Sequence, residues 1–502
     1  MALPSSPPSP GLFKSICLIA TCTMSMLINI LNNTSVSISL PAIGRELGIV
    51  ETQLQWLVSA YALSSGCLLL IFGRLADLHG RKRVFIAGSC WLAVFSLACG
   101  FAPDSVSLQV LRGLQGVGAA ASIPASLGIL ARSFPLGRRM RPVAFATFAA
   151  GAPLGAVIGM AIGATLTQLS RLSWRSNFFL SSALTAFYII TGILIIDPDE
   201  PSDETDRRVD WLGAILVTTG LVLVVFVLSD GEIAPHSWKS PYVITCLLLG
   251  ITLLGAFLFW QRYLESLQRT LQASTSCLTP PPLLKLSLWT RDGGRFAAIM
   301  VIALFNWAAF NGWNYWAQLY YQNYKGYSPV LTMIRLLPMF VVGVLCNIGM
   351  AFIVCRVSLL WILAAGTGLT SCAAMFFALI QPNASYWAFG FPGASLSVFG
   401  ADFVFAGGTM FVAKIVLPHE QSLSGALFQT MTQLGTALGV ATTTIVFNRI
   451  HLQEAAQDGI SRPSAPTHVP QRIGLQAYKG AQWTSFVFGV LGKPFLLVHA
   501  PL

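Results

Sequence analysis

The sequence predicts an all-α integral membrane protein with 14 transmembrane helices. Of its 502 residues, 55% are hydrophobic and only 10% are charged, and the mean hydropathy is +0.69. A soluble domain carries about 25% charged residues, so this chain lacks the charges that would cover a water-facing surface. Apolar stretches of the length that crosses a bilayer as a helix also recur along the whole chain. Both observations indicate that the apolar stretches lie in a lipid bilayer.

A run of glycines supports the same class. In GAPLGAVIGMAIG, Gly151, Gly155, Gly159 and Gly163 follow one another at intervals of four. Each would cost a soluble helix about 1 kcal/mol relative to alanine. In lipid the backbone has no water with which to exchange its hydrogen bonds, so the helix persists and the glycines leave a smooth face for a neighbouring helix. We therefore expect Gly155, Gly159 and Gly163 to form a helix-packing motif.

The spans follow one another along the whole chain. They are predicted at residues 13–40, 53–73, 84–101, 107–130, 143–168, 177–196, 211–229, 240–261, 296–321, 329–354, 357–380, 386–413, 421–447 and 481–498. A weak internal echo relates the two ends of this series, because residues 424–444 repeat the glycine spacing of the fifth span at Gly435 and Gly439. The predicted organisation is a tail (1–12), a six-helix bundle (13–196), two additional helices (211–261), a linker (262–295) and a second six-helix bundle (296–498).

Basic residues predict the orientation. With the N-terminus inside, most of the 30 Lys and Arg fall in inner loops, such as Arg81 and Arg83 after the second span and Arg138 and Arg139 after the fourth. The positive-inside rule then places both termini, the tail and the linker 262–295 in the cytoplasm. We expect a multi-pass protein, most simply a monomer in the plasma membrane.

Cysteine and histidine spacings argue against metal and redox chemistry. The ten cysteines include no CxxC pair, and the six histidines form no HExxH motif. The net charge of +11 reflects the loops of a membrane protein rather than a nucleic-acid surface. We therefore expect no metal, no cofactor, no nucleic-acid partner and no enzymatic activity.

The strongest functional signal is GRLADLHGRKRVF, at residues 73–85 between the second and third spans. Glycines permit a tight turn there, and Asp77 can pair with an arginine or cap a helix. The stretch resembles the signature loop of the major facilitator superfamily, with Gly73, Asp77, Gly80 and Arg81 at matching positions. The resemblance implies a gating motif whose contacts form in one access state and break in the other. An ordinary basic inner loop is the alternative interpretation.

The fourth span carries a second resemblance to that family. LQVLRGLQGVGAAASIPAS, at residues 108–126, is similar to the family's fourth-span motif, with Arg112 and Gln115 in place. An arginine at membrane depth costs several kcal/mol unless it is paired or hydrated, so it usually marks a polar pathway. Arg112 is therefore a proton-coupling candidate, and Gln115 is a candidate for the substrate cavity.

Two further stretches narrow the resemblance to one branch. The glycine run resembles the fifth-span antiporter motif, although ordinary helix packing explains the glycines equally well. VDWLGAIL, at residues 209–216, looks like the start of two additional spans. The chain thus resembles the 14-span drug:proton antiporter branch, particularly fungal aminotriazole-resistance-type exporters. This implies a major facilitator fold of two six-helix bundles plus two additional helices.

Acidic residues are almost absent from the spans. The first span carries Asn32 where the branch commonly has aspartate, and Asp402 is the only acid deep in a predicted span. A carboxyl in a low-dielectric setting can exchange a proton near neutral pH, so Asp402 is the first candidate for proton coupling. The alternative interpretations are a structural pairing with Arg335 or Lys414 and a lone protonated acid without a coupling role. Asn29 and Asn32 are candidates either for the substrate cavity or for helix–helix hydrogen bonds.

The ninth span carries a polar and aromatic stripe in ALFNWAAFNGWNYWAQLYYQ. Trp307, Asn311, Asn314 and Gln318 follow helical spacing, and Trp313 flanks them. Such a face would be costly in lipid and suits a cavity for an amphipathic or aromatic molecule. These residues are the principal substrate-cavity candidates.

These observations together predict a secondary active transporter that works by alternating access. The expected function is proton-coupled efflux of drugs, toxins or secondary metabolites, with the lipid bilayer, a small-molecule substrate and protons as partners. The alternative, which Asn32 favours, is a proton-independent facilitator or importer of a small polar solute or ion.

Overall fold

The structure is a computed structural model of the whole chain. It describes residues 11–49, 53–134, 140–199, 208–231, 234, 237–269, 280–353, 356–415, 421–457 and 471–492. Most of the predicted tail 1–12, the middle of the predicted linker 262–295 and the end of the last predicted span lie outside these residues. The all-helical class is confirmed, since the described residues contain helices and no strand.

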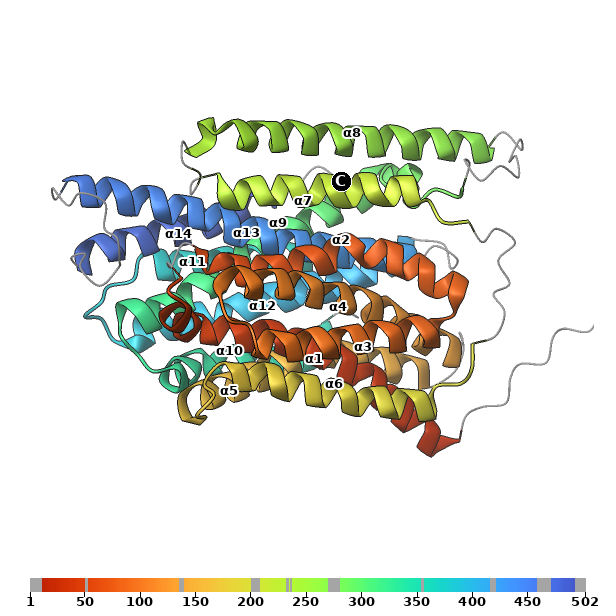
Figure 1. Cartoon of the computed structure of the whole chain (residues 1–502), viewed down its shortest axis with the longest axis horizontal. Helices are drawn as coiled ribbons and strands as arrows, with labels where there is room; N and C mark the ends of the chain where they lie inside the picture. The colour runs from red at the N-terminus through yellow and green to blue at the C-terminus, as the bar shows by residue number, and fades with distance from the viewer. Residues whose placement is uncertain are drawn as a thin grey trace, which may run out of the picture.

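The described residues form fourteen long α-helices (Figure 1). The first bundle consists of α1 (Leu12–Leu47), α2 (Gln55–His79), α3 (Arg81–Gly100), α4 (Ser105–Ser133), α5 (Met140–Leu169) and α6 (Arg175–Ile195). An additional pair follows, α7 (Trp211–Asp230) and α8 (Pro241–Arg269). The second bundle consists of α9 (Arg295–Leu319), α10 (Pro329–Ile353), α11 (Leu359–Ala378), α12 (Tyr386–Ile415), α13 (Gln421–Gln457) and α14 (Gln471–Leu491).

Four short helical turns connect these elements. Three are 3₁₀ turns, η2 (Ser237–Lys239), η3 (Leu286–Leu288) and η4 (Arg291–Gly294), and one is a π turn, η5 (Tyr320–Tyr324), which continues α9. We call the end of the molecule that carries the α2–α3 turn the inner end and the opposite end the outer end.

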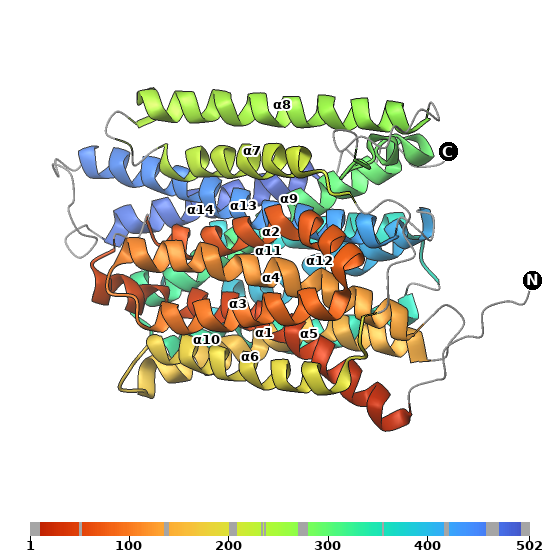
Figure 2. The same ribbon diagram turned by 45° about the vertical axis from the view of Figure 1, so that its right-hand side comes forward.

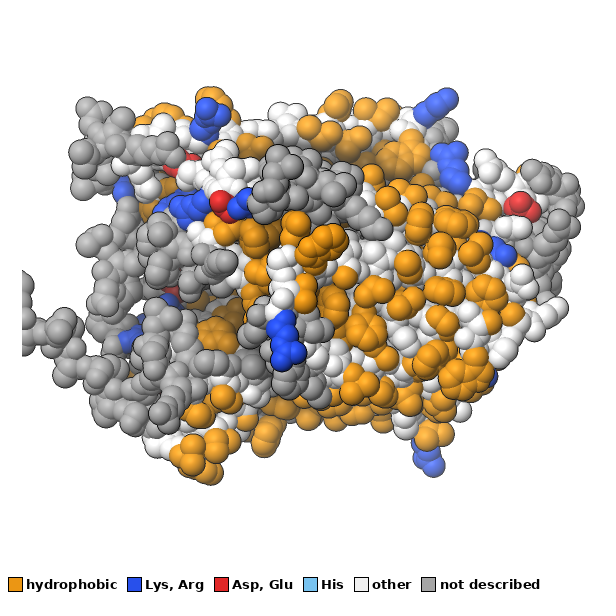
Figure 3. Space-filling view, turned by 180° about the vertical axis from the view of Figure 1, so that it is seen from behind, with side chains coloured by type: hydrophobic (Ala, Val, Ile, Leu, Met, Phe, Trp, Pro, Cys, Tyr) orange, Lys and Arg blue, Asp and Glu red, His pale blue; other side chains and the backbone are white. Residues whose placement is uncertain are grey.

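Twelve of the fourteen helices, α1 to α12, are long and apolar enough to cross a membrane. The remaining two, α13 and α14, carry more polar residues, among them the buried Thr436, Thr443 and Gln482. Space-filling representation of one face shows hydrophobic side chains across the middle and Lys and Arg toward the two ends (Figure 3). This distribution is that of a multi-pass membrane protein.

Helix contacts define how the bundles meet. Within the first bundle α1 packs on α5 and α4 packs on α2 and α3, and within the second bundle α9 packs on α13 and α11 on α12 and α14. The main contacts between the bundles are those of α2 with α13 and of α5 with α10, and smaller ones join α1 to α9 and α10 and α4 to α13. We call the α2–α13 and α5–α10 contacts the two seams between the bundles.

The additional pair lies on one side of the molecule. α7 packs on α2 and on α13, and therefore covers the seam between them, while α8 packs mainly on α7 (Figures 1 and 2). Apolar side chains hold α7 against the seam. For example, the ring centres of Trp56 in α2 and Phe226 in α7 are 5.8 Å apart. The pair thus touches both bundles through a single helix.

Asp210 anchors the inner end of this pair. It is 1% exposed, and its carboxylate accepts hydrogen bonds from the backbone N–H of Gly213 (2.8 Å), from Trp260 Nε1 (2.9 Å) and from Gln261 Nε2 (2.5 Å). Gln261 in turn accepts from the backbone N–H of Leu284 at 3.0 Å. One carboxylate therefore caps α7, fixes α8 and holds the linker.

A similar cap begins α4. Asp104 accepts hydrogen bonds from the backbone N–H of Ser107 at 2.9 Å and from its hydroxyl at 2.7 Å. These bonds favour the ionised carboxyl, so they lower the pKa of Asp104 below its ordinary value. A first-turn carboxylate of this kind is a helix N-cap.

Candidate functional site

The α2–α3 turn is built on Gly80. Its φ of 108° and ψ of 128° lie in a region that side chains disfavour. The Asp199 carboxylate also fills the space beside it, since a Cβ at Gly80 would lie 2.3 Å from Asp199 Oδ2. That carboxylate accepts from the backbone N–H groups of Lys82 (2.8 Å) and Arg83 (3.0 Å), and so caps α3. Asp199 was not predicted from the sequence.

Two predicted gating residues pair across the turn. Arg81 donates to Asp77 Oδ1 from Nε at 3.1 Å and from Nη2 at 2.8 Å, and its Nη1 donates to the carbonyl of Gly128 in α4 at 2.8 Å. Lys82 Nζ donates to the carbonyls of Ile193 (2.9 Å) and Ile196 at the end of α6. The turn therefore ties α2 and α3 to α4 and α6 of the same bundle.

Gly73, the fourth gating candidate, has a looser environment. A Cβ there would lie 3.7 Å from Cβ of Pro124, which is ordinary contact. The contacts of Gly73, Asp77, Gly80 and Arg81 describe a single conformation, so their role in gating between access states stays a prediction.

The predicted helix-packing glycines form the closest helix contact of the first bundle. A Cβ at Gly155 would lie 2.3 Å from the carbonyl oxygen of Leu27, and one at Gly159 would lie 2.8 Å from Cα of Leu31. At Gly163 it would lie 2.8 Å from Cα of Ser35. At Gly155 all the nearest obstructing atoms belong to the backbone of α1, and at Gly159 and Gly163 backbone and side-chain atoms obstruct together, so glycine permits this approach.

The second bundle repeats the arrangement. A Cβ at Gly435 would lie 2.3 Å from the carbonyl oxygen of Leu304, and one at Gly439 would lie 2.2 Å from that of Ala308. α13 therefore packs on α9 as α5 packs on α1. The echo between residues 151–163 and 424–444 corresponds to a shared packing device.

Arg112 lies in a fully buried polar cluster of the first bundle. Its Nε donates to the carbonyl of Leu57 at 2.9 Å, its Nη1 donates to Gln115 Oε1 at 2.6 Å, and its guanidinium carbon lies 4.4 Å from the centre of the Tyr61 ring. Gln115 Nε2 donates to the Ser96 hydroxyl at 2.7 Å. Arg112 Nη2 has no hydrogen-bond partner in the structure. A buried guanidinium with a free N–H pair can still donate to an acceptor that enters the cluster.

The two predicted asparagines of α1 belong to the same bundle interior. Both are 1% exposed. Asn29 Oδ1 accepts from the Tyr61 hydroxyl, and Asn32 Oδ1 accepts from the Ser181 hydroxyl at 2.5 Å. Their amide nitrogens have no partner in the structure. Both asparagines thus make helix–helix hydrogen bonds, while their cavity role stays a prediction.

The stripe on α9 keeps to one face of the helix, but its burial increases toward the outer end. Trp307 contacts the Phe405 ring of α12 at 5.6 Å, and Asn311 Nδ2 donates to Thr436 Oγ1 of α13 at 3.1 Å. Both side chains are half-buried. Asn314 and Gln318 are buried and joined by a hydrogen bond of 3.1 Å from Gln318 Nε2.

Trp313 points into the second bundle. It is 0% exposed, and its ring meets Phe377 of α11 edge-to-face at 5.4 Å. Its backbone carbonyl accepts from Gln482 of α14 at 3.2 Å. This is a core environment, and the assignment of Trp313 to the substrate cavity remains a prediction.

Asp402 lies halfway along α12 and is half-buried. A Cβ at Gly343 of α10 would lie 3.6 Å from Asp402 Oδ2. Arg335, one of the partners considered above, instead lies over the Tyr386 ring at 4.5 Å. Tyr386 is 16 residues from Asp402 on the same helix, which is about 24 Å along its axis. Arg335 is therefore too far away to pair with Asp402, and the side chain of Lys414 lies outside the described residues.

The outer end of the molecule is closed between the bundles. Buried apolar residues of α1, α5, α9 and α10 form one continuous cluster there. Gln322 donates to the carbonyl of Ile38 at 2.9 Å, and Gln168 accepts from the backbone N–H of Val330 at 3.4 Å. Any opening in this state is thus at the inner end.

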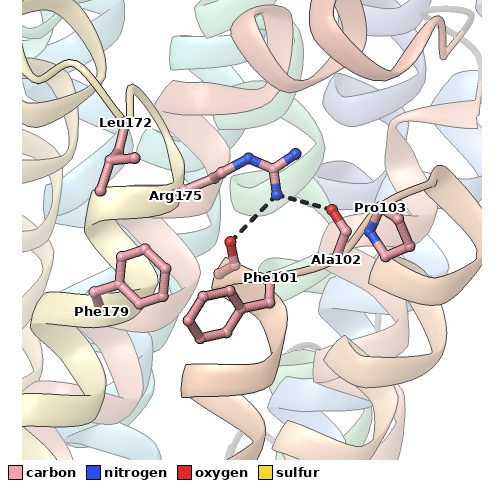
Figure 4. Close-up of a pocket in the computed structure, with 7 residues that line it drawn as sticks. Phe101, Ala102, Pro103, Leu172, Arg175 and Phe179 are labelled. Carbon is pink, nitrogen blue, oxygen red and sulfur yellow. Dashed lines mark hydrogen bonds between the residues drawn. The ribbon is translucent and has the colours of Figure 1, made fainter.

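A surface pocket of about 640 Å³ flanks the first bundle at its outer end, between α3 and α6 (Figure 4). Arg175 projects across it and donates from Nη1 to the carbonyls of Gly100 (3.2 Å) and Ala102 (2.8 Å). The same guanidinium pairs with Glu46 at 3.0 Å, and Trp174 Nε1 donates to the other carboxylate oxygen at 2.6 Å. These bonds fasten α6 to α1 and α3, so the residues of this pocket serve the scaffold.

No group of three His, Cys, Asp or Glu side chains in the described part of the chain could hold a metal ion.

Comparison with known proteins identifies a transporter family and its members as relatives of this chain. The chain matches the family described as Major Facilitator Superfamily over residues 22–230 and 206–440. It is 26% identical to "MFS-type transporter 1" of Pyricularia oryzae over 97% of this chain and 86% of that protein. It is also 26% identical to "Major facilitator superfamily multidrug transporter mfsC" of Aspergillus fumigatus, over 96% and 86% of the two chains.

A third relative is named for a different substrate. The "Low affinity ammonium transporter" of Saccharomyces cerevisiae is 26% identical over 84% of this chain and 78% of its own length. Among solved structures, the POT family transporter PepTSo has a TM-score of 0.66 with 13% identity, and the match covers 96% of this chain and 99% of that one. That likeness concerns the fold alone. Since the family match runs from residue 22 to residue 440, the chain belongs to the Major Facilitator Superfamily and is a membrane transporter of that type.

Proposed function

We propose that this transporter exports an organic drug, toxin or secondary metabolite in exchange for protons, by alternating access. The observation that carries the proposal is the position of Asp402, a carboxyl halfway along a membrane helix and against Gly343 of the neighbouring helix. Such a carboxyl can hold and release a proton as its exposure to water changes.

The packing of α10 links this carboxyl to movement. α10 contacts α12, which carries Asp402, and also contacts α5 of the opposite bundle. Loss of the Asp402 charge changes the α10–α12 contact and thereby the α5–α10 seam. Proton uptake is thus coupled to the relative position of the bundles, which is what alternating access requires. Arg112 is the second proton-coupling candidate, in the first bundle.

The substrate side of the proposal rests on α9. Trp307 and Asn311 combine an aromatic face with an amide, and both are half-buried beside α12 and α13. This pairing suits an amphipathic or aromatic molecule. The multidrug relative in Aspergillus fumigatus supports the same substrate class.

The proposal includes the finer topology. All fourteen helices span the membrane, because α13 and α14, which are 37 and 21 residues long, pack on α9 and α11 within the second bundle. Polar residues of α13 such as Thr436 then face other helices rather than lipid. Both termini are cytoplasmic, the membrane is the plasma membrane, and the transporter works as a monomer of the drug:proton antiporter branch.

The test is ethidium flux in sealed proteoliposomes, with and without an imposed pH gradient. The wild type should move ethidium in a gradient-dependent manner, and Asp402→Asn should abolish that dependence. Asp292→Asn is the matched control, since Asp292 is an exposed acid in η4 that pairs with Arg295 at 3.1 Å. Gradient-driven export that survives in Asp402→Asn would overturn the coupling assignment.

A second candidate is a proton-independent facilitator or importer of a small polar solute or ion. Asn32 favours it, because this neutral side chain is buried where the resembling branch commonly has aspartate, and the ammonium transporter of yeast is a relative. Flux of methylammonium that ignores the pH gradient, together with no ethidium flux, would favour this candidate.

A further inference from the structure

A second pocket, of about 180 Å³, lies at the outer end of the second bundle. Its walls come from η5 and the residues that follow it, from α10, and from the α11–α12 connection with the start of α12. The side chains that carry chemistry there are Tyr320, Tyr321, Lys325, Tyr327, Arg335 and Tyr386. We call it the tyrosine pocket.

The charge of the tyrosine pocket is positive. Lys325 and Arg335 both line it, and none of its lining residues is acidic. Lys325 Nζ donates to the carbonyl of Pro382, and the Arg335 guanidinium lies 4.5 Å from the Tyr386 ring centre and 5.9 Å from that of Tyr327. No carboxylate of the described residues pairs with either cation. A region with two cations and no counter-charge attracts an anion.

A tyrosine hydroxyl of the pocket also lacks a partner. Tyr320 is 2% exposed, and its hydroxyl is buried with no hydrogen-bond partner in the structure. A buried polar group in this condition is unfavourable unless a bound molecule satisfies it. Gly390 allows two other rings of the pocket to pack closely on α12, because a Cβ there would lie 2.5 Å from Tyr321 Oη and 2.5 Å from the Tyr386 ring.

We propose that the tyrosine pocket binds a small aromatic carboxylate. The planar fork of Arg335 matches a carboxylate, the Tyr320 hydroxyl can donate to it, and the rings of Tyr321, Tyr327 and Tyr386 suit a flat apolar body. A cavity of about 150 Å³ is known to hold benzene, so the volume of this pocket fits a single ring with its carboxylate.

This site is separate from the proposed coupling residue Asp402. Tyr386 and Asp402 are about 24 Å apart along α12. The segment that lines the pocket also carries Gln322, which donates to the Ile38 carbonyl of α1 across the closed outer end. A bound carboxylate stiffens that segment and so favours the closed outer end.

The test uses benzoate and the purified full chain in lipid nanodiscs, with binding followed by equilibrium dialysis of radiolabelled benzoate. The wild type should bind saturably, and Arg335→Gln should weaken binding about tenfold or more, as expected for a hydrogen-bonded ion pair. Lys239→Gln is the control for charge, since Lys239 is an exposed cation at the same end but outside the pocket. Its affinity should equal that of the wild type.

Tyr320→Phe separates binding from folding. Because its hydroxyl has no partner in the protein, removing it should leave thermal stability at or above the wild-type value and weaken benzoate binding about threefold to tenfold. Benzylamine, a cation of the same size, should not bind. Absence of saturable benzoate binding, an unchanged affinity in Arg335→Gln, or equal binding of benzylamine would each overturn the proposal.

Discussion

Replacing Gly155 by alanine should force α1 and α5 apart. The added methyl would lie 2.3 Å from the Leu27 carbonyl oxygen, about 1 Å closer than ordinary van der Waals contact. Leu27 Cα and carbonyl carbon would each be 3.0 Å away, so backbone rather than a movable side chain obstructs the methyl. Overpacking of this kind costs about 1–3 kcal/mol, which exceeds the gain of about 1 kcal/mol that alanine brings to a helix.

The equivalent change in the second bundle is Gly439→Ala. Its methyl would lie 2.2 Å from the Ala308 carbonyl oxygen and 2.5 Å from its Cα, so the expected cost is similar. Gly113→Ala in α4 is the matched control, because no atom lies within 4 Å of its Cβ position. That control should be neutral or stabilising by up to about 1 kcal/mol.

The assay measures the apparent melting temperature of the detergent-purified protein, as the loss of the monodisperse peak in size-exclusion chromatography of heated samples. Gly155→Ala and Gly439→Ala should both melt below the wild type and below Gly113→Ala. If Gly155→Ala melts with Gly113→Ala, the described α1–α5 contact is wrong. A loss in only one of the two bundles would refute the equivalence of the α1–α5 and α9–α13 pairs.

Two further changes test other contacts. Asp210→Ala removes the acceptor of two buried donors and one half-buried donor, and should cost about 1–3 kcal/mol or more. Hydrogen exchange at the amides of Gly213 and Leu284 should become faster. Asp230→Ala, which loses one exposed bond, is the control. Trp313→Ala should destabilise the second bundle by about 3–5 kcal/mol, as measured by melting temperature. Equal hydrogen exchange in both aspartate variants, or a wild-type melting temperature for Trp313→Ala, would contradict these contacts.

The sequence predicts the helices better than it predicts their partners. Each of the fourteen predicted spans overlaps one α-helix, because apolar length and composition are local properties of the chain. The pairing of Arg112 with Gln115 also follows from helical spacing. In contrast, the contact of Gly155 with Leu27 joins segments more than 100 residues apart, and spacing alone shows only that some helix packs there.

The ninth span illustrates the limit most clearly. Helical spacing places Trp307 and Asn311 on one face, and Trp313 and Trp316 on another. Both faces are aromatic, so the pattern does not reveal which of them faces the interior of the second bundle. The structure turns Trp313 and Trp316 inward, onto Phe377 and Phe447. Asp210 had a partial signal, since an acid before an apolar run is typical of a helix N-cap, but its bonds to α8 had none.

The additional helices give the molecule two unlike sides in the membrane plane. The α2–α13 seam lies behind α7 and α8, whereas the α5–α10 seam is on the opposite side of the molecule from them (Figures 1 and 2). α7 and α8 therefore stand between the bilayer and the α2–α13 seam, whereas neither of them covers the α5–α10 seam. A bilayer-soluble compound that approached a seam from the lipid would therefore have its shorter route at the α5–α10 side.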